Sequence, residues 1–187
     1  MGLRLNLLAI SVIPIILFAA AMLGVVTRQT ATLSAELGNL IEDRLVSDKQ
    51  TALTNYAELA ETAIRPLVKR QSNTAQSQQQ AKTVLNAMTF GEDGYFYVYD
   101  YAGNNLVHPR LSELVGKNLW DLQDPNGNFV IQGLIEQAKA GGGFHSYLWN
   151  KPSTGLEEPK IGFALGIDSW GWMLGTGLYL DDIRGEV

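Results

Sequence analysis

The chain has 187 residues, of which 46% are hydrophobic and 18% are charged, and it contains no cysteine. This length indicates one domain with a short appendage. The absence of cysteine excludes a disulfide framework and thiolate chemistry. Arg4 is the only charged side chain before residue 28, so residues 28–187 carry 13 basic and 19 acidic side chains and a net charge of −6. This acidic balance argues against a nucleic-acid partner.

The first segment of the chain is apolar. No ionisable residue occurs in the 23 positions from Leu5 to Thr27, and a bilayer-spanning helix needs about 20 mostly apolar residues. We therefore predict that residues 1–27 form a cytoplasmic start and a transmembrane helix, with Arg4 keeping the amino terminus inside. A cleaved signal peptide with its cleavage site at residues 19–21 is the alternative. Both interpretations export the rest of the chain.

A long amphipathic helix is predicted for residues 29–69. This range has no proline before Pro66, and its apolar residues recur at spacings built from threes and fours: Leu33, Leu37, Ile41, Leu45, Ala52, Tyr56, Leu59, Ala63 and Leu67. Such a long stripe indicates a coiled coil or a helix that runs the length of the molecule, and we expect two copies to pair through it as a homodimer. We interpret the polar residues 71–82 as a connection and residues 84–91 as a second short helix.

The composition changes at Gly91, after which aromatic residues and glycines are concentrated. Residues 95–99 alternate tyrosines with Phe96 and Val98, and a turn at residues 101–105 leads into a returning strand, which is typical of a hairpin. Residues 128–140 are predicted as a helix. Three further strands are predicted at residues 144–149, 161–167 and 172–180, with a turn at residues 152–159 between the first two. The expected fold class is α+β, with a five-stranded antiparallel sheet.

The sequence offers little for catalysis. Its two histidines, His108 and His145, have no metal-binding spacing, and there is no nucleophile motif or phosphate loop. We therefore expect no enzyme activity, no metal and no cofactor. A membrane-anchored enzyme using His108 and an acidic partner stays open as an alternative. His145 is interpreted as structural.

The predicted sheet instead carries aromatic and hydrogen-bonding side chains on alternating positions, as in a pocket for a small polar ligand. A carboxylate requires one cation and several neutral donors. Each candidate also has a structural interpretation, because tyrosines are good strand residues and a lysine at a strand start is ordinarily solvated. The candidate ligand-binding residues are Tyr97, Tyr99, His108, Tyr147, Trp149 and Lys160.

Five successive motifs resemble, in order and spacing, the single Cache domain of bacterial chemoreceptors, in its subtype with a long amino-terminal helix. They are GEDGYFYVYDYAGNNLVHP (91–109), LVGKNLWDLQDPNGNF (114–129), GGGFHSYLWNKP (141–152), EPKIGFALGI (158–167) and WGWMLGTGLYLDDI (170–183). The resemblance implies a sensor domain over residues 28–183 with a PAS-like sheet. It also implies that residues 184–187 begin a linker to a second membrane helix.

This resemblance carries expectations about function. It implies a periplasmic, inner-membrane-anchored sensor of a methyl-accepting chemotaxis protein that binds small carboxylates such as acetate, propionate, pyruvate or lactate. It implies that the six candidate residues line the pocket and that the long helix lies at a dimer interface. The alternatives are the ectodomain of a sensor histidine kinase or cyclic-dinucleotide enzyme, and a purely structural dimerisation module.

Overall fold

The computed structural model describes residues 2–70 and 74–180, except for the side chains of residues 2–17, 19–21, 31, 34, 35, 38, 39, 42 and 43. The chain divides into two units, residues 1–45 and residues 46–187. The predicted domain boundary at residue 28 stays a prediction, and the predicted linker at residues 184–187 lies outside the described residues.

Helix α1 (Gly2–Val68) confirms the predicted long helix. Its residues up to 45 form the first unit, and its residues 46–68 belong to the second. The predicted membrane segment, residues 5–27, lies mostly outside the side chains that the structure describes. Among the described residues, no helix combines the length and hydropathy of a membrane span. The apolar side chains described in the first unit are largely exposed: Phe18, Met22, Leu23, Val25, Val26, Leu33, Leu37, Leu40 and Ile41.

Helix α2 (Thr74–Ala87) corrects the prediction of a connection at residues 71–82. The segment is polar along most of its length, but Ser77, Ala81 and Leu85 recur every four residues and are buried. Small residues at this spacing let the helix pack closely on its neighbours, and tertiary packing supplies most of the stability of a helix in a folded domain. The helix predicted at residues 84–91 is therefore wrong in its bounds: residues 84–87 are the end of α2, and residues 89–90 form a short strand.

The second unit contains the predicted five-stranded antiparallel sheet, in the order β4-β3-β7-β6-β5. Its strands are β3 (Tyr97–Asp100), β4 (Asn105–Val107), β5 (Gly143–Asn150), β6 (Glu157–Ile167) and β7 (Trp172–Tyr179). Strand β6 begins four residues earlier than predicted because its residues 157–164 pair with the whole of β5. The short strands β1 (Thr89–Phe90) and β2 (Gly94–Tyr95) form a separate pair.

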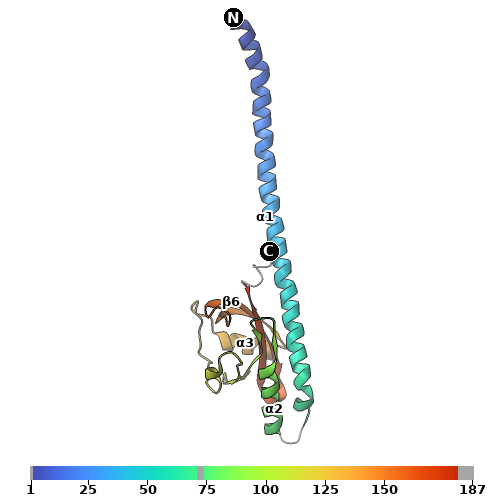
Figure 1. Cartoon of the computed structure of the whole chain (residues 1–187), viewed down its shortest axis with the longest axis vertical. Coiled ribbons are helices and arrows are strands. Elements are labelled where there is room, and N and C mark those ends of the chain that lie inside the picture. The colour runs from blue at the N-terminus through green and yellow to red at the C-terminus, as the bar shows by residue number, and fades with distance from the viewer. Residues whose placement is uncertain (1, 71–73, 181–187) are drawn as a thin grey trace. The chain divides into compact units, whose positions relative to one another are not determined.

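Helices cover both faces of this sheet (Figure 1). On one face, Ala60 and Ile64 of α1 and Leu85 of α2 pack with Phe96 and Val98. On the other face, helix α3 (Val130–Lys139) packs against the tyrosines of β2 and β3. The predicted alternation of the hairpin is therefore confirmed, and each set of side chains has its own core.

Two turns of the second unit share one construction. Asp100 and Asp124 each accept hydrogen bonds from the backbone N–H groups two and four residues later, and from the side-chain amide of the asparagine four residues later. A glycine with positive φ stands three residues after each aspartate, where a Cβ would be strained. Asp124 accepts one further bond, from the N–H of Leu148 in β5 at 2.9 Å, and so ties the turn before α3 to the sheet.

Candidate ligand-binding site

A small cavity lies between helix α3 and the face of the sheet that carries the tyrosines. Its free internal volume is about 10 Å³, which is room for about one water molecule. A larger occupant requires side chains to move. The cavity is lined by Tyr95, Tyr97, Tyr99, His108, Val130, Ile131, Leu134, Tyr147 and Trp149.

The register of the strands brings the polar residues of this face together. Lys160 of β6 lies opposite Tyr147 of β5 and opposite Tyr179 of β7, and directly opposite residues share a face of the sheet. Glycines provide the space that these long side chains fill. A Cβ at Gly175 would lie 2.1 Å from the ring of Tyr97, and one at Gly177 would lie 2.7 Å from the Lys160 side chain.

Lys160 is a buried cation with aromatic surroundings. Its side chain is 1% exposed, and its Nζ donates hydrogen bonds to the hydroxyls of Tyr95 at 2.9 Å and Tyr179 at 3.4 Å. The same Nζ lies 4.2, 5.8 and 4.7 Å from the ring centroids of Tyr95, Tyr97 and Tyr179. Burial lowers the pKa of Lys160 to about 7, against a smaller opposing effect of the Asp93 charge. The hydroxyl of Tyr95 connects this amine to the cavity wall.

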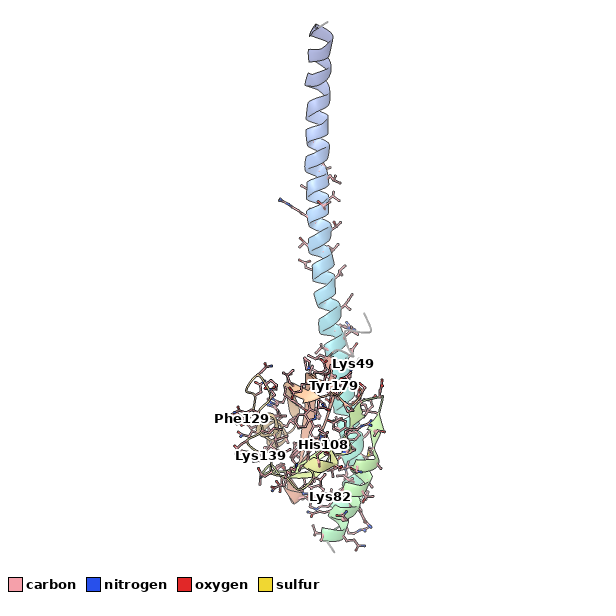
Figure 2. All side chains as sticks on the ribbon, turned by 60° about the vertical axis from the view of Figure 1, so that its left-hand side comes forward. Lys49, Lys82, His108, Phe129, Lys139 and Tyr179 are labelled. Carbon is pink, nitrogen blue, oxygen red and sulfur yellow. The ribbon has the colours of Figure 1, made fainter. Side chains whose placement is uncertain are left out.

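His108 is held as a neutral hydrogen-bond donor. Its Nδ1 accepts the backbone N–H of Leu111 at 3.0 Å, so the hydrogen of the neutral ring resides on Nε2. Burial, and then the charge of Lys160, lower the pKa of His108 to about 3. The ring lies between those of Tyr95 and Trp149, with centroid distances of 5.0 and 6.1 Å. Figure 2 labels His108 and Tyr179 on the second unit.

The tyrosine hydroxyls stay protonated across the physiological pH range, because burial raises the pKa of Tyr95, Tyr97 and Tyr147. The hydroxyl of Tyr97 lies 3.2 Å from the carbonyl oxygen of Thr176, to which it donates, and 3.1 Å from the hydroxyl of Tyr147. Two other buried polar atoms of the lining residues, Tyr99 Oη and Trp149 Nε1, make no hydrogen bond of normal geometry among the described residues, although the Asn105 side chain lies near enough to Tyr99 to oppose the effect of burial on its pKa. Buried polar groups normally have partners, so these two atoms indicate a place for a polar ligand.

The opposite wall of the cavity is apolar. Helix α3 contributes Val130, Ile131 and Leu134, each 1% exposed. The cavity therefore has one side with a neutral imidazole and hydroxyls, behind which the Lys160 amine is buried, and another side that fits an alkyl group. This arrangement can bind an anion with a short apolar tail.

Five of the six candidate residues predicted from the sequence line the cavity: Tyr97, Tyr99, His108, Tyr147 and Trp149. The sixth, Lys160, stands behind Tyr95 and reaches the wall through its hydroxyl. Their role in ligand binding stays a prediction. The sequence analysis did not select Tyr95, although it shares the alternation of the other tyrosines, or Tyr179, whose place depends on strand register.

His145 and the acidic residues contribute no comparable site. The ring of His145 lies under α3 beside Gly133, and the residue is not part of the cavity lining. In the described part of the chain, no group of three or more His, Asp or Glu side chains is placed to hold a metal ion. The pair at residues 181 and 182 lies outside the described residues.

The antiparallel sheet with a small polar-lined cavity on one face and a long helix on the other defines a sensor domain of PAS-like architecture. The family model described as Single Cache domain 2 matches residues 45–187. The chain therefore belongs to the single Cache family, which confirms the resemblance of its motifs.

The relatives of this chain are signalling proteins. It is 41% identical over 184 residues to the sensor histidine kinase MctS of Rhizobium johnstonii, a match that covers 98% of this chain and 40% of that protein. The chain spans 20% to 40% of the length of the curated relatives it matches.

Solved structures agree with this assignment. A methyl-accepting chemotaxis protein from Vibrio parahaemolyticus matches with a TM-score of 0.72 and 42% identity, over 76% of this chain and 95% of that one. A structure reported as the basis for carboxylic acid recognition by a Cache chemosensory domain matches with a TM-score of 0.67 and 25% identity, over 73% and 97%. The chain thus carries a Cache sensor domain of the kind found in chemoreceptors and sensor kinases.

Proposed function

We propose that the cavity between α3 and the sheet binds a short monocarboxylate and that binding is the signal this domain transmits. The observation that carries the proposal is the Lys160 amine, which is buried and has no carboxylate within ion-pair distance among the described residues. A buried cation without a counter-charge is costly, and an anionic ligand supplies that charge. The relative described as recognising carboxylic acids supports the same ligand class.

The dimensions and chemistry of the walls define the ligand class further. The small free volume means that side chains must move to admit a ligand, which favours the shortest acids, of two to four carbons, and the apolar wall of α3 fits their alkyl end. A dicarboxylate would place its second charge against Val130, Ile131 and Leu134, where burial of an unpaired charge is unfavourable. Acetate, propionate, pyruvate and lactate are therefore the proposed ligands. No covalent step is required of the cavity.

We further propose that this sensor is anchored in the bacterial inner membrane with its ligand-binding unit in the periplasm. The apolar run at residues 5–27 supports the anchor, and a structural relative described as a periplasmic sensor domain of a chemotaxis protein supports the location. Leu33, Leu37 and Leu40 of α1 are 51% to 64% exposed. We propose that this stripe pairs two copies as a homodimer.

A chemoreceptor is the first candidate for the whole protein. A sensor histidine kinase is the second candidate, favoured by the MctS match, which extends over 98% of this chain and so includes the amino-terminal helix. The two candidates differ in the reaction that is controlled by ligand binding. Autophosphorylation and receptor methylation, measured on full-length protein in membranes with and without propionate, separate them.

The test of ligand binding is a thermal-shift screen of the full chain in detergent against short monocarboxylates, dicarboxylates, amino acids and sugars. A ligand at 100 times its dissociation constant stabilises the folded state by about 2.7 kcal/mol, which raises the melting temperature of a domain of this size by roughly 5 to 10 °C. We expect shifts with short monocarboxylates alone. No shift with any acid, in folded protein freed of carried-over ligand, would contradict the proposal.

Two pairs of variants assign the effect to the cavity. Lys160→Met and His108→Leu are expected to abolish the shift. Their matched controls are Lys139→Met, a lysine that lies 5.0 Å from the centroid of the Tyr101 ring away from the cavity, and His145→Leu. Both controls are expected to keep the shift, and its loss in the controls as well would disconnect it from the cavity.

A further inference from the structure

The amine of Lys160 is enclosed by groups that carry no charge at neutral pH. Its hydrogen-bond acceptors are the two phenol hydroxyls of Tyr95 and Tyr179, and three aromatic rings lie within 6 Å of its Nζ. Neutral oxygens and ring faces stabilise an ammonium much less than a carboxylate does. The site is therefore built so that the charge of Lys160 depends on what enters the cavity.

The charged groups around Lys160 are few. Asp93, the acid whose charge acts on Lys160, lies 3.9 Å from the ammonium of Lys151 and also accepts hydrogen bonds from both the N–H and the hydroxyl of Ser153. Glu158 lies two residues earlier on the same strand face. The remaining titratable side chains that face Lys160 from the packed elements are Tyr95, Tyr97, Tyr147, Tyr179, His108 and Lys151.

We propose that the cavity binds a carboxylate together with one proton, and that the proton is taken up by the amine of Lys160. This inference rests on the proposed function and specifies its second ligand. The neutral amine accepts the proton and becomes an ammonium, and the incoming carboxylate provides the opposite charge. The pair that enters the protein is electrically neutral, which removes most of the cost of burying either ion alone.

The titration of the site gives the direction of the pH effect. The pKa of Lys160 is lowered to about 7 by burial, and an adjacent carboxylate raises the pKa of an amine. Below pH 7 the amine is already protonated and binding takes up no proton. Above pH 7 the amine must first be protonated, so we expect the affinity to fall about tenfold for each pH unit.

The other cavity groups do not obscure this effect. The pKa of His108 is lowered to about 3, so the imidazole is neutral throughout the same range. The tyrosine pKa values are raised by burial, so their hydroxyls stay protonated. The proposed consequence is a sensor that responds to carboxylate alone in acidic surroundings and to the product of carboxylate and proton activities in alkaline ones.

The experiment is isothermal titration calorimetry of the full chain in detergent with propionate, at each pH in two non-carboxylate buffers whose own pKa values lie within about one unit of that pH. The two buffers differ in ionisation enthalpy, so the difference between the observed enthalpies counts the protons taken up. We expect close to one proton per propionate at about pH 8.5 and close to none at about pH 5.5. Binding with no proton uptake at either pH would overturn the inference.

A residue-specific measurement assigns the proton. In the chain labelled with ¹³C at lysine Cε, one resonance is expected to titrate near pH 7 and to be absent from Lys160→Met. Saturating propionate is expected to move its midpoint upward. If the Lys160 resonance instead titrates with the other lysines near their ordinary pKa of about 10.4, the inference is wrong. Lys139→Met is the control in which the resonance near pH 7 stays.

The outcomes separate this inference from the function on which it rests. If propionate and the other short acids fail to bind at about pH 5.5, where the amine is charged, the proposed function fails. If propionate binds equally well at about pH 5.5 and 8.5, the function stands and the proton is not a ligand. An affinity loss at high pH with uptake of one proton supports both.

Discussion

The two faces of the sheet in the second unit differ in what their burial achieves. One face is predominantly apolar: Phe96, Val98 and Leu174 are at most 3% exposed and belong to the core with α1 and α2. The other face buries five tyrosines, a histidine and a lysine to a similar degree. The same strands supply both faces. Because successive side chains point to opposite faces, alternate residues of one strand contribute either to the apolar core or to the proposed ligand site.

The two faces of the sheet therefore contribute differently to the stability of the domain. The apolar face gains free energy from every side chain that it buries. The tyrosine face holds a desolvated amine and two hydrogen-bonding atoms that have no partner among the described residues, and both features are unfavourable without a ligand. We infer that the first face stabilises the register of the strands, while the second face keeps polar groups available for a ligand.

The largest expected effect comes from the apolar face. Leu174 is fully buried and lies opposite Val98 and Leu165 in register, so Leu174→Ala is expected to lower the free energy of unfolding by about 2 to 5 kcal/mol. Urea denaturation followed by circular dichroism measures this loss. The control Leu156→Ala removes a side chain that is 61% exposed and should cost less than about 0.5 kcal/mol. Equal losses would contradict the comparison.

The tyrosine face is expected to make stability depend on pH. The pKa of Lys160 is about 7 in the folded protein against an ordinary value of 10.5, so between these values the unfolded chain binds more protons. Stability then rises with pH, by at most about 1.4 kcal/mol per unit. Urea midpoints at about pH 7 and pH 9 should show this rise in the native chain and a smaller one in Lys160→Met. Identical slopes in the two proteins would count against the buried amine.

The two aspartate turns allow a matched comparison of how strongly helix α3 is held to the sheet. Asp124 and Asp100 make the same bonds within their turns, but Asp124 also accepts the N–H of Leu148. Hydrogen bonds to a charged group contribute about 1.5 to 3 kcal/mol, so Asp124→Ala should destabilise the chain more than Asp100→Ala by about that amount. Only Asp124→Ala should also weaken propionate binding, because its turn positions α3. Thermal melts with and without propionate test both statements.

The smallest effect concerns two tyrosines of the same face. The Tyr97 hydroxyl has two partners, Tyr147 and the carbonyl of Thr176, whereas the Tyr99 hydroxyl has none among the described residues. Tyr97→Phe should therefore lower the free energy of unfolding by about 1 kcal/mol, and Tyr99→Phe should leave it unchanged or raise it. A larger loss in Tyr99→Phe would mean that its hydroxyl already has a partner.

Much of the fold was predictable because its signals are local. Alternation in residues 95–99 depends only on the period of a strand, and the turn at residues 101–105 depends on Asp100 and Gly103. Helix α2 was not predictable from its composition. Its sequence is rich in glutamine and has no strong apolar stripe, and two of its three buried residues, Ser77 and Ala81, are small. The start of β6 was missed because pairing with β5, rather than residue type, extends the strand to Glu157.

The candidate site divides in the same way. The sequence by itself determined which residues share a face, the family to which the chain belongs and five lining residues of the cavity, because these follow from periodicity and motif order. Only the tertiary structure decided that Lys160 lies between Tyr147 and Tyr179 and that Tyr95 connects it to the cavity. Strand register and burial arise from contacts between distant segments, and they set both the neighbours of the amine and its pKa.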